Sequence, residues 1–411
     1  MRTVAEHRAA LLADLEPLPP VRMPTLDTLG LVLAEGVVAA TDLPGFDNSA
    51  MDGYAVRAAD LAGASPEHPV VIDVDGDIAA GDTRAHVLTP GHAMRIMTGA
   101  PLPEGADAVV PVERSDGGVT RAALTLEPEV GRHIRHRGED VRSGDVVVRA
   151  GVRIGPGHVA LITAANVPEV SVHPRPRVAV FSTGDELARV GSPLKHGQIV
   201  DSNGAMLAAL VRAAGAQIAY VGHLRDDAEE VSALLSDLPG QPDLVLTTGG
   251  VSMGAYDTIK EVLAGSGVQF VKVAMRPGMP QGYGRVGARH TPIVTLPGNP
   301  LSSLVSFHVY VLPMVRRLAG LPAAADPADG TFEATALTDW PAAEGKVEWT
   351  RVVVERGEAG LGVRPSGGQG SHMLGALADG SALALVPATV DAVRRGDHLR
   401  CLPLVGQEPP R

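Results

Sequence analysis

The sequence has a single cysteine, Cys401, among its 411 residues. One cysteine forms no intrachain disulfide, and it excludes a zinc site built from several thiolates as well as a CxxC redox pair. Aromatic residues make up only 3% of the chain, which excludes the stacking platforms that bind single-stranded nucleic acid. Lysine is also scarce, because the 35 basic residues are arginines except for Lys195, Lys260, Lys272 and Lys346.

The chain carries a net charge of −12, so bulk electrostatic attraction does not bring it to nucleic acid or to acidic lipid. It contains no stretch of 18 apolar residues, which a membrane-spanning helix requires. The first 20 residues are interrupted by Glu6, Asp14 and Glu16 and lack the continuous apolar core of a signal peptide. We therefore expect a cytoplasmic protein with neither a membrane nor a nucleic acid as partner.

At about 150 residues per domain, the length predicts two to four domains. A short helix is expected over 3–15, and the short apolar runs of 68–130 predict a small antiparallel β-domain. From 177 to 320 apolar strand patterns alternate with helical periodicity, as in the helix expected over 202–215 with Ser202 as its N-cap. This alternation predicts a parallel, doubly wound sheet, and the strand patterns after residue 330 predict a C-terminal β-domain.

Three of the predicted strands end in glycine-containing loops, at 183–186, 247–254 and 297–303. Ligands of open α/β sheets bind outside the carboxyl ends of the strands, and glycine lets backbone N–H groups approach an anion. Each loop alone is typical of an ordinary tight turn, but three at one edge favour a binding site. The candidate binding residues in them are Asp185, Gly249, Gly250, Ser252, Pro297, Asn299 and Pro300.

Carboxylates also follow these strands, so the fold should bring them towards one rim. Mg²⁺ between protein and phosphate takes such oxygen ligands. For two of the carboxylates, at 226 and 227, helix capping remains an equal alternative. The set comprises Asp185, Glu186, Asp226, Asp227 and Asp257.

A stiff segment over 276–284, with two prolines and three glycines, is predicted to be a shaped loop. Lys272 and Arg276 beside it could hold an oxyanion by charge-assisted hydrogen bonds, although solvated surface cations remain the alternative. The chain lacks the GxxxxGK[ST] loop, the GxSxG nucleophile elbow and HExxH.

Eight segments together resemble one family, the MoeA-type molybdopterin molybdenumtransferases, which also occur as the E domain of gephyrin. The segments follow the family order over nearly the whole chain. They are DNSAMDGYAV (47–56), RIMTGAPLPEGADAVVPVE (95–113), IRHRGEDV (134–141), VAVFSTGDEL (178–187), GQIVDSNGAML (197–207), TTGGVSMGAYD (247–257), RPGMPQGYG (276–284) and LPGNPLSS (296–303).

The resemblance implies an α/β multidomain fold with four domains. Domain I is elongated and built from 1–20, 40–46 and 140–174, and the small inserted β-rich domain II comprises 21–39 and 47–139. Domain III, at 175–322, is the doubly wound domain of molybdopterin-binding type, and domain IV, at 323–411, is β-rich. The resemblance also implies a homodimer whose cleft lies between domain III of one chain and domain II of the other.

The implied reaction inserts molybdate into the dithiolene of adenylylated molybdopterin, with Mg²⁺ assisting and AMP released. Glu186, Asp226 and Asp257 would bind the metal. The family's functional positions correspond to Asp52, Thr98, Arg135, Asp140, Glu186, Asp226, Asp257, Lys272, Arg276, Pro297 and Pro300.

One departure concerns residues 272–284, here called the basic segment, where the family often has lysines at the positions of Arg276 and Met279. This substitution leaves the preference between molybdate and tungstate open. One copy of the pattern uses the whole chain, so we expect the adenylylated substrate to come from a separate adenylyltransferase, with transient contacts to that enzyme and to proteins that mature molybdoenzymes. An interaction scaffold of the gephyrin type and a tungstate-inserting paralogue are the alternative functions.

Overall fold

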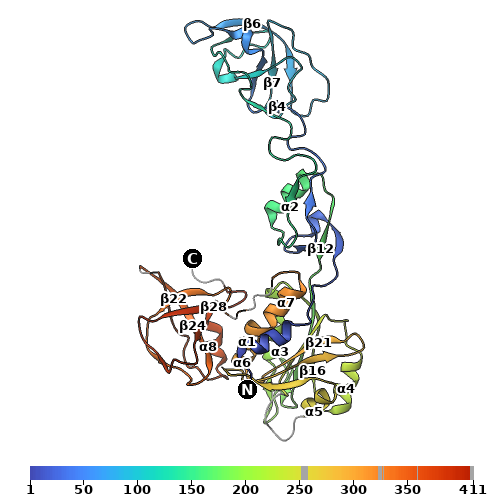
Figure 1. Ribbon diagram of the computed structural model, residues 1–411, viewed down its shortest axis with the longest axis vertical. Coiled ribbons are helices and arrows are strands. Elements are labelled where there is room, and N and C mark those ends of the chain that lie inside the picture. The colour runs from blue at the N-terminus through green and yellow to red at the C-terminus, as the bar shows by residue number, and fades with distance from the viewer. Residues whose placement is uncertain (251–257, 323–325, 327, 359, 408–411) are drawn as a thin grey trace. The chain divides into compact units, whose positions relative to one another are not determined.

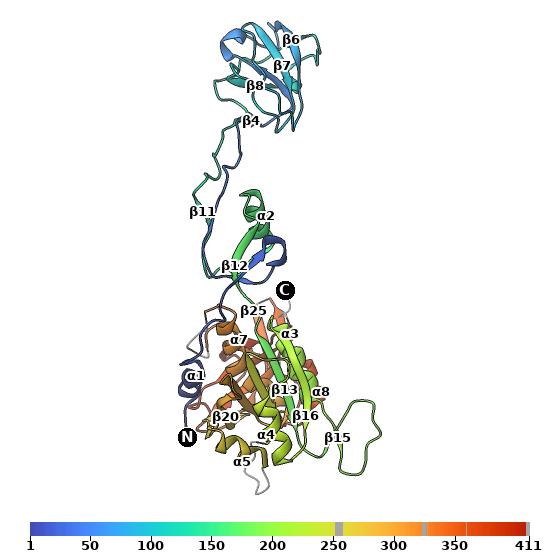
Figure 2. The ribbon, with the colours of Figure 1, turned by 90° about the vertical axis from the view of Figure 1, so that its right-hand side faces the viewer.

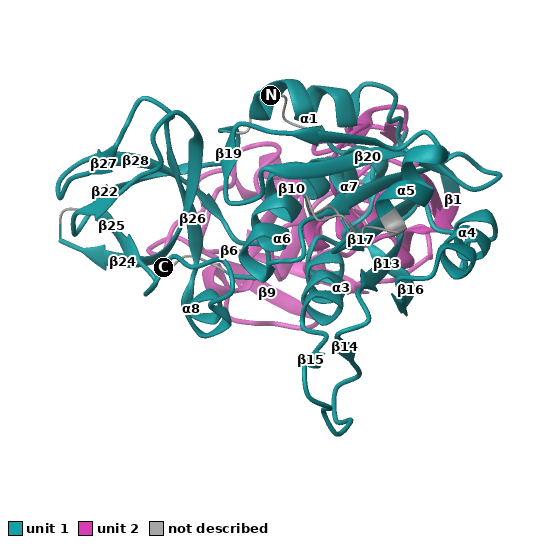
Figure 3. Cartoon of the chain, turned by 90° about the horizontal axis from the view of Figure 1, so that it is seen from below, with its two compact units in different colours: residues 1–21, 30–34, 172–411 teal, residues 22–29, 35–171 magenta. Residues whose placement is uncertain are grey.

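The computed structural model describes residues 1–250, 258–322, 326, 328–358 and 360–407. The chain divides into two compact units, which Figure 3 distinguishes by colour. Unit 1 consists of Met1–Val21, Gly30–Ala34 and Val172–Arg411, and unit 2 of Arg22–Leu29 and Glu35–Ser171. Within the described residues, no helix has both the length and the apolar character needed to cross a membrane.

Unit 1 contains a six-stranded sheet in the order β16-β13-β17-β21-β20-β18. Its first four strands are parallel, as the alternating sequence pattern predicts. These are β13 (Arg177–Thr183), β16 (Gln217–Leu224), β17 (Leu244–Thr248) and β21 (Thr291–Leu296).

The remaining two strands, β20 (Pro280–Val286) and β18 (Gln269–Lys272), are antiparallel to their neighbours. The segment 276–284, predicted as a loop, is therefore mostly strand. Two of its glycines serve close packing, because a Cβ on Gly282 would lie 2.9 Å from Phe270 Cε1 in β18, and one on Gly284 would lie 2.8 Å from the Cα of Val268, which precedes β18. Gly278 is different, since it lies before β20 and has a left-handed φ of 96°. The sequence pattern did not reveal the packing role, since glycine also marks turns.

Helices cover the two faces of this sheet (Figure 1). Val178, Val180 and Leu246 pack on one face, and Phe181 and Val245 pack on the other, so the strands are buried on both sides. The helices are α3 (Asn203–Ala213), α4 (Ala228–Ser236), α5 (Thr258–Gly265), α6 (Pro300–Ser306) and α7 (Leu312–Leu318), with a π-helical turn over Phe307–Val311.

The start of α3 differs from the sequence expectation. Ser202 occupies the N-cap position, but its side chain makes no capping hydrogen bond. Asp201 Oδ1 instead accepts a hydrogen bond from the Gly204 N–H at 2.9 Å. A carboxylate satisfies the free N–H groups of a first turn as well as a hydroxyl does, so either neighbour could have served.

The C-terminal part of unit 1 closes a five-stranded barrel. Its strands are β24 (Val347–Gly357), β25 (Gly360–Pro365), β22 (Phe332–Ala336), β28 (His398–Pro403) and β26 (Ala382–Val386), and β26 pairs back to β24. Cys401 is buried in β28, and burial raises the pKa of its thiol to about 12.

Unit 2 contains a five-stranded sheet in the order β8-β5-β7-β6-β9. The antiparallel prediction holds for three of its four strand pairs, but β6 and β7 run parallel. The strands are β5 (Gly53–Val56), β6 (Val70–Ile78), β7 (His92–Ile96), β8 (Ala108–Pro111) and β9 (Arg121–Leu124).

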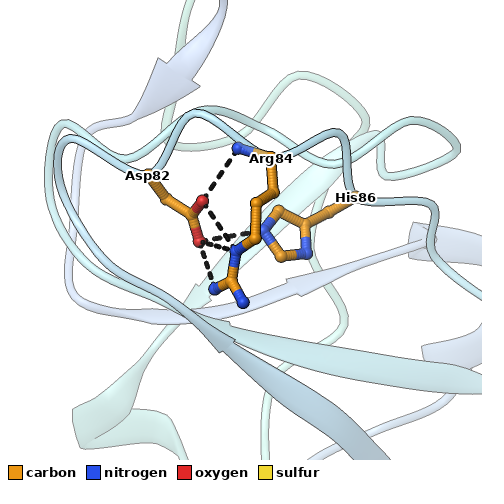
Figure 4. A network of polar contacts seen from close by, with 3 residues as sticks. All are labelled: Asp82, Arg84 and His86. Atoms are coloured by element: carbon orange, nitrogen blue, oxygen red, sulfur yellow. Dashed lines mark hydrogen bonds and ion pairs between the residues drawn. The ribbon is translucent and has the colours of Figure 1, made fainter.

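A polar network orders the loop between β6 and β7 (Figure 4). Asp82, whose side chain is 8% exposed, accepts hydrogen bonds from Arg84 Nη2 at 2.6 Å and from the Arg84 backbone N–H at 2.9 Å, and His86 Nε2 lies 3.0 Å from its carboxylate. The Arg84 side chain, followed by its N–H and by His86, holds the pKa of Asp82 well below its usual range. The long loop that leads to the parallel strand β7 is thus fixed by hydrogen bonds within the loop itself.

Short elements complete the two units. The segment between β14 (Leu187–Ala188) and β15 (Ile199–Val200) extends away from the α/β sheet of unit 1, as Figure 2 shows. The remaining helices are α1 (Val4–Leu12), α2 (Pro156–Ala164) and α8 (Leu374–Asp379). The remaining strands are β1 (Val21–Pro24), β2 (Val32–Leu33), β3 (Val37–Val38), β4 (Asn48–Ser49), β10 (Ile134–Arg135), β11 (Val146–Val148), β12 (Glu169–His173), β14 (Leu187–Ala188), β15 (Ile199–Val200), β19 (Met275–Arg276), β23 (Trp340–Pro341) and β27 (Ala392–Val393).

Two buried histidines, His7 in α1 and His308 in the π-helical turn, hold neutral rings inside unit 1. Burial lowers the pKa of each from 6.5 to about 4. His308 Nδ1 bonds to the carbonyl of Leu304, and its Nε2 accepts a hydrogen bond from the backbone N–H of Val405 at 2.9 Å. Protonation of His308 would remove that acceptor.

This burial predicts a loss of stability in acid. In the unfolded chain these histidines bind protons below about pH 6.5, whereas in the folded chain they stay neutral until about pH 4. The free energy of unfolding is therefore at its full value above about pH 6.5 and falls as the pH drops from about 6.5 to about 4. The loss is a few kcal/mol per histidine, at about 1.4 kcal/mol per pKa unit. Urea unfolding at a series of pH values should show that the free energy of unfolding falls less steeply with acid in His308→Gln than in the parent protein. His196→Gln, at an exposed position, is the control. Equal slopes for all three proteins would contradict the assignment.

Candidate functional site

The loops after β13 and β16 meet at the carboxyl edge of the parallel strands. The backbone N–H of Asp226 donates to Asp185 Oδ1 at 3.2 Å, and His223 Nε2 lies 2.7 Å from the carbonyl oxygen of Gly184. The Glu186 carboxylate folds over Gly184, because a Cβ there would lie 2.6 Å from Glu186 Oε1. The three carboxylates Asp185, Glu186 and Asp226 therefore lie on two loops that are bonded to each other.

The two aspartates that open the segment before α4 have different roles. Asp227 is the N-cap of α4, and its Oδ1 accepts hydrogen bonds from the N–H groups of Glu229 and Glu230, both at 2.9 Å. Capping therefore accounts for Asp227. Asp226 instead contacts the Asp185 loop through its backbone N–H, and the side-chain cap of α4 comes from Asp227.

The glycine turn after β17 packs against the end of β13. Gly249 and Gly250 have φ values of 95° and 66°, in the left-handed region that favours glycine. A Cβ on Gly249 would lie 2.5 Å from Thr183 Oγ1 and 2.8 Å from the Thr183 carbonyl oxygen. Of the predicted site residues on this loop, Ser252 and Asp257 lie outside the described residues.

The loop after β21, with Pro297, Asn299 and Pro300, is tied to the same edge. The hydroxyl groups of Thr248 and Ser303 both donate to the carbonyl oxygen of Pro297. Asn299 stands at the N-cap of α6 without a side-chain capping bond, and Pro300 is the first residue of that helix.

Asn203, at the start of α3, is a site residue that the sequence reasoning missed. Its Nδ2 donates to Thr248 Oγ1 at 3.1 Å and to the carbonyl oxygen of Gly298 at 2.6 Å, so it joins two of the loops. Its Oδ1 and the hydroxyl of Ser182 are buried and find no partner among the described residues. The only sequence signal was its place in the segment GQIVDSNGAML, which marks a helix start as readily as a binding position.

The basic segment reaches the same edge from the antiparallel side of the sheet. Lys272 ends β18 and is exposed. Gln281 Nε2 donates to Ser306 Oγ and to the Gly278 carbonyl oxygen, both at 2.7 Å, which packs the segment against α6. Arg276 is on β19, with Nη1 3.8 Å from Glu348 Oε2. Glu348 is a second residue that the sequence reasoning missed.

The remaining candidates belong to unit 2. Asp52 Oδ1 accepts hydrogen bonds from the backbone N–H of Thr98 at 2.6 Å and from its hydroxyl at 2.9 Å, and these bonds lower the pKa of Asp52. Arg135 is exposed on β10, opposite Asn48 of β4. Asp140 lies on a turn where its N–H donates to the Leu43 carbonyl oxygen at 3.1 Å.

The carboxylates of unit 1 offer hard oxygen donors of the kind that Mg²⁺ prefers. Over the described ranges, no three His, Cys, Asp or Glu side chains converge on one point. Mg²⁺ does not need such a cage, since it keeps several waters and binds one or two carboxylates together with substrate phosphates. The joined loops of Asp185, Glu186 and Asp226 fit that mode of binding.

These features define an α/β protein whose polar strand-end loops gather at one edge of the sheet, and the family comparisons place this domain in the molybdopterin-binding class. A model described as "Probable molybdopterin binding domain" matches residues 179–317. Models of the MoeA N-terminal region (domain I and II) and of the MoeA C-terminal region (domain IV) match 2–166 and 333–404. The chain belongs to the MoeA family.

Several relatives match along almost their entire length. Molybdopterin molybdenumtransferase 2 of Mycobacterium tuberculosis (strain H37Rv) is 44% identical, covering 97% of this chain and 99% of the relative. The molybdopterin molybdenumtransferase of Haemophilus influenzae is 34% identical, covering 98% of both. The crystal structure of a molybdopterin biosynthesis MoeA protein from Pyrococcus horikoshii has a TM-score of 0.83 and 28% identity, covering 98% of this chain and 99% of that chain.

The packing of Gly249 gives a test of how the rim is assembled. Gly249→Ala adds a methyl group against Thr183 as well as a left-handed φ, whereas Gly191→Ala, with a φ of 82° and no atom within 4 Å of its Cβ, adds only the backbone cost. We expect Gly249→Ala to be the less stable variant by about 1–3 kcal/mol, the usual cost of overpacking. Chemical unfolding of both variants measures the difference. Equal losses would show that Gly249 is needed for its φ alone.

Proposed function

We propose that this transferase of molybdenum cofactor biosynthesis inserts molybdenum from molybdate into the dithiolene of adenylylated molybdopterin and releases AMP. The observation that carries the proposal is the joining of four loops at one edge of the sheet. Hydrogen bonds link the loop of Asp185 to that of Asp226, and Thr248 and Asn203 link the glycine turn to the loop of Pro297 and Gly298.

The chemistry of this edge suits a substrate with several negative charges. In the left-handed turn of Gly249 and Gly250, the Gly249 N–H donates to the Leu296 carbonyl oxygen at 3.1 Å, and Gly250 follows at the half-buried end of the turn. Left-handed turns of this kind place N–H groups where they can bind phosphate oxygens. Lys272 and Arg276 add cationic donors for an oxyanion. The reacting sulfurs belong to the substrate's dithiolene, so the chain needs no thiolate of its own.

Glu186, Asp226 and Asp257 are the residues proposed to hold Mg²⁺, which would neutralise the pyrophosphate and the departing AMP. The protein's part is to hold those carboxylates in place. Gly184 leaves room for the Glu186 carboxylate to fold back, and the Asp226 N–H fixes the loop of Asp185. The loops that carry Asp226 and Asp185 are thereby held together before any substrate binds.

Asp52, Thr98, Arg135 and Asp140 are proposed to complete the site from the second subunit of a homodimer. The hydrogen bonds from Thr98 keep the Asp52 carboxylate ionised and oriented although it is exposed. A fixed carboxylate of this kind suits a role in positioning substrate, because its orientation is set before binding.

The direct test mixes the purified protein with adenylylated molybdopterin, Mg²⁺ and molybdate and measures AMP release. Glu186→Gln should abolish most of the release yet leave the melting temperature nearly unchanged, because exposed carboxylates contribute about 0.5 kcal/mol or less to stability. Glu358→Gln, at an exposed turn of the barrel, is the matched control. Full activity of Glu186→Gln, or an unreactive parent protein, would reject the assignment; an unreactive parent would favour a scaffold.

A second test asks whether each cleft is built from two chains. Asp52→Ala and Glu186→Ala subunits, each inactive alone, should recover activity when mixed, because one of the two clefts in a mixed dimer would carry neither substitution. Random exchange of equal amounts predicts about a quarter of the parent activity, since half of the dimers are mixed. Confirmed exchange without recovery would place both residues in one chain's site.

A further inference from the structure

The cation proposed to bind an oxyanion has a carboxylate partner in the barrel. Arg276 on β19 pairs in parallel register with Glu348 on β24, so a short strand of the basic segment is attached to the barrel wall. Arg276 Nη1 lies 3.8 Å from Glu348 Oε2. The two residues are 72 positions apart, and only the closure of the barrel against the basic segment brings them together.

Glu348 is fixed independently of Arg276. Its side chain is only 8% exposed, and its Oε2 accepts a hydrogen bond from the Ala343 N–H at 2.7 Å while its Oε1 accepts one from Thr350 Oγ1 at 3.3 Å. These bonds prevent the carboxylate from following a moving partner. The Arg276 side chain, by contrast, is 60% exposed.

The separation of 3.8 Å is too long for a hydrogen bond, so the attraction between the two groups is mainly coulombic. The guanidinium therefore keeps its N–H donors for another anion, while part of its positive charge is offset. Met279, at a position where the family often has a lysine, is apolar and adds no positive charge that would replace the part offset by Glu348.

We propose that Glu348 is a positioning residue that orients Arg276 and lowers its effective charge, and so sets how strongly the basic segment holds a small dianionic oxyanion such as molybdate. The inference rests on the proposed function, in which Arg276 contacts the oxyanion. Glu348 touches no reacting atom and acts only through Arg276. A weakened cation holds the oxyanion less tightly before its metal is transferred.

The test is the molybdate dependence of AMP release, with molybdate binding measured separately by calorimetry. Glu348→Gln keeps the shape and an acceptor for Ala343 but removes the charge. It should lower the half-saturating molybdate concentration by roughly threefold to tenfold, the effect of one partly screened charge at this distance, with little change in kcat. Glu355→Gln, on the same strand and paired with Arg364, makes the same change in net charge and should not alter the molybdate dependence.

Three further variants separate the outcomes. Arg276→Ala should raise the molybdate requirement at least about tenfold, and adding Glu348→Gln to it should then have no effect, because Glu348 acts through Arg276. If Arg276→Ala leaves the molybdate dependence unchanged, the oxyanion role within the proposed function is wrong. If Arg276→Ala weakens molybdate binding but Glu348→Gln behaves like Glu355→Gln, the role of Glu348 alone is overturned. If Glu348→Gln melts early, Glu348→Asp serves in its place, because it withdraws the charge by one methylene group. It should shift the molybdate requirement in the same direction by a smaller factor. No shift would again overturn the role of Glu348.

Discussion

The close approach of the strand-end loops at the carboxyl edge of the α/β sheet is the constraint on which the rest of unit 1 depends. Gly249 must lie against Thr183 with no side chain between them, and Asn203 must reach both Thr248 and the Gly298 carbonyl oxygen. These contacts leave no room for larger residues. They join three separate turns into one continuous rim, and the rim sets the positions of the carboxylates that it carries.

Some polar groups of the rim are not satisfied by hydrogen bonds within the protein. Most buried polar side chains in folded proteins find a partner. In the described part of this edge, the hydroxyl of Ser182 and the Oδ1 of Asn203 do not. Asp227 caps α4 through its Oδ1, which separates this structural aspartate from its neighbour Asp226. Unused hydrogen-bonding capacity is therefore present where the substrate is proposed to bind, and among the described residues it also occurs elsewhere, at His7, Trp340 and Trp349.

The C-terminal barrel also contacts and supports the edge of the α/β sheet. Through β19 and β24 it is continuous with the basic segment, and Glu348 extends its influence to Arg276. Buried Arg351 on the same strand donates to Ser366 Oγ and to the Gly368 carbonyl oxygen, and the adjacent Ser371 carbonyl oxygen accepts the N–H of Leu301 in α6. The barrel thus supports the edge of the α/β sheet at two places, one at the basic segment and one at α6.

The sequence by itself determined most of the element types, including the four parallel strands, and the placement of glycines and carboxylates after them, because periodicity and turn chemistry are local properties. It also indicated the family, through eight ordered segments. It did not reveal that 280–286 is a strand, since glycines that allow strands to approach look the same as glycines that form turns. Asp226 and Asp227 were indistinguishable until α4 took one of them as its cap. The partners Asn203 and Glu348 were decided only by the tertiary structure, because each lies 45 or more residues from the group it contacts, and no local pattern encodes a contact across that distance.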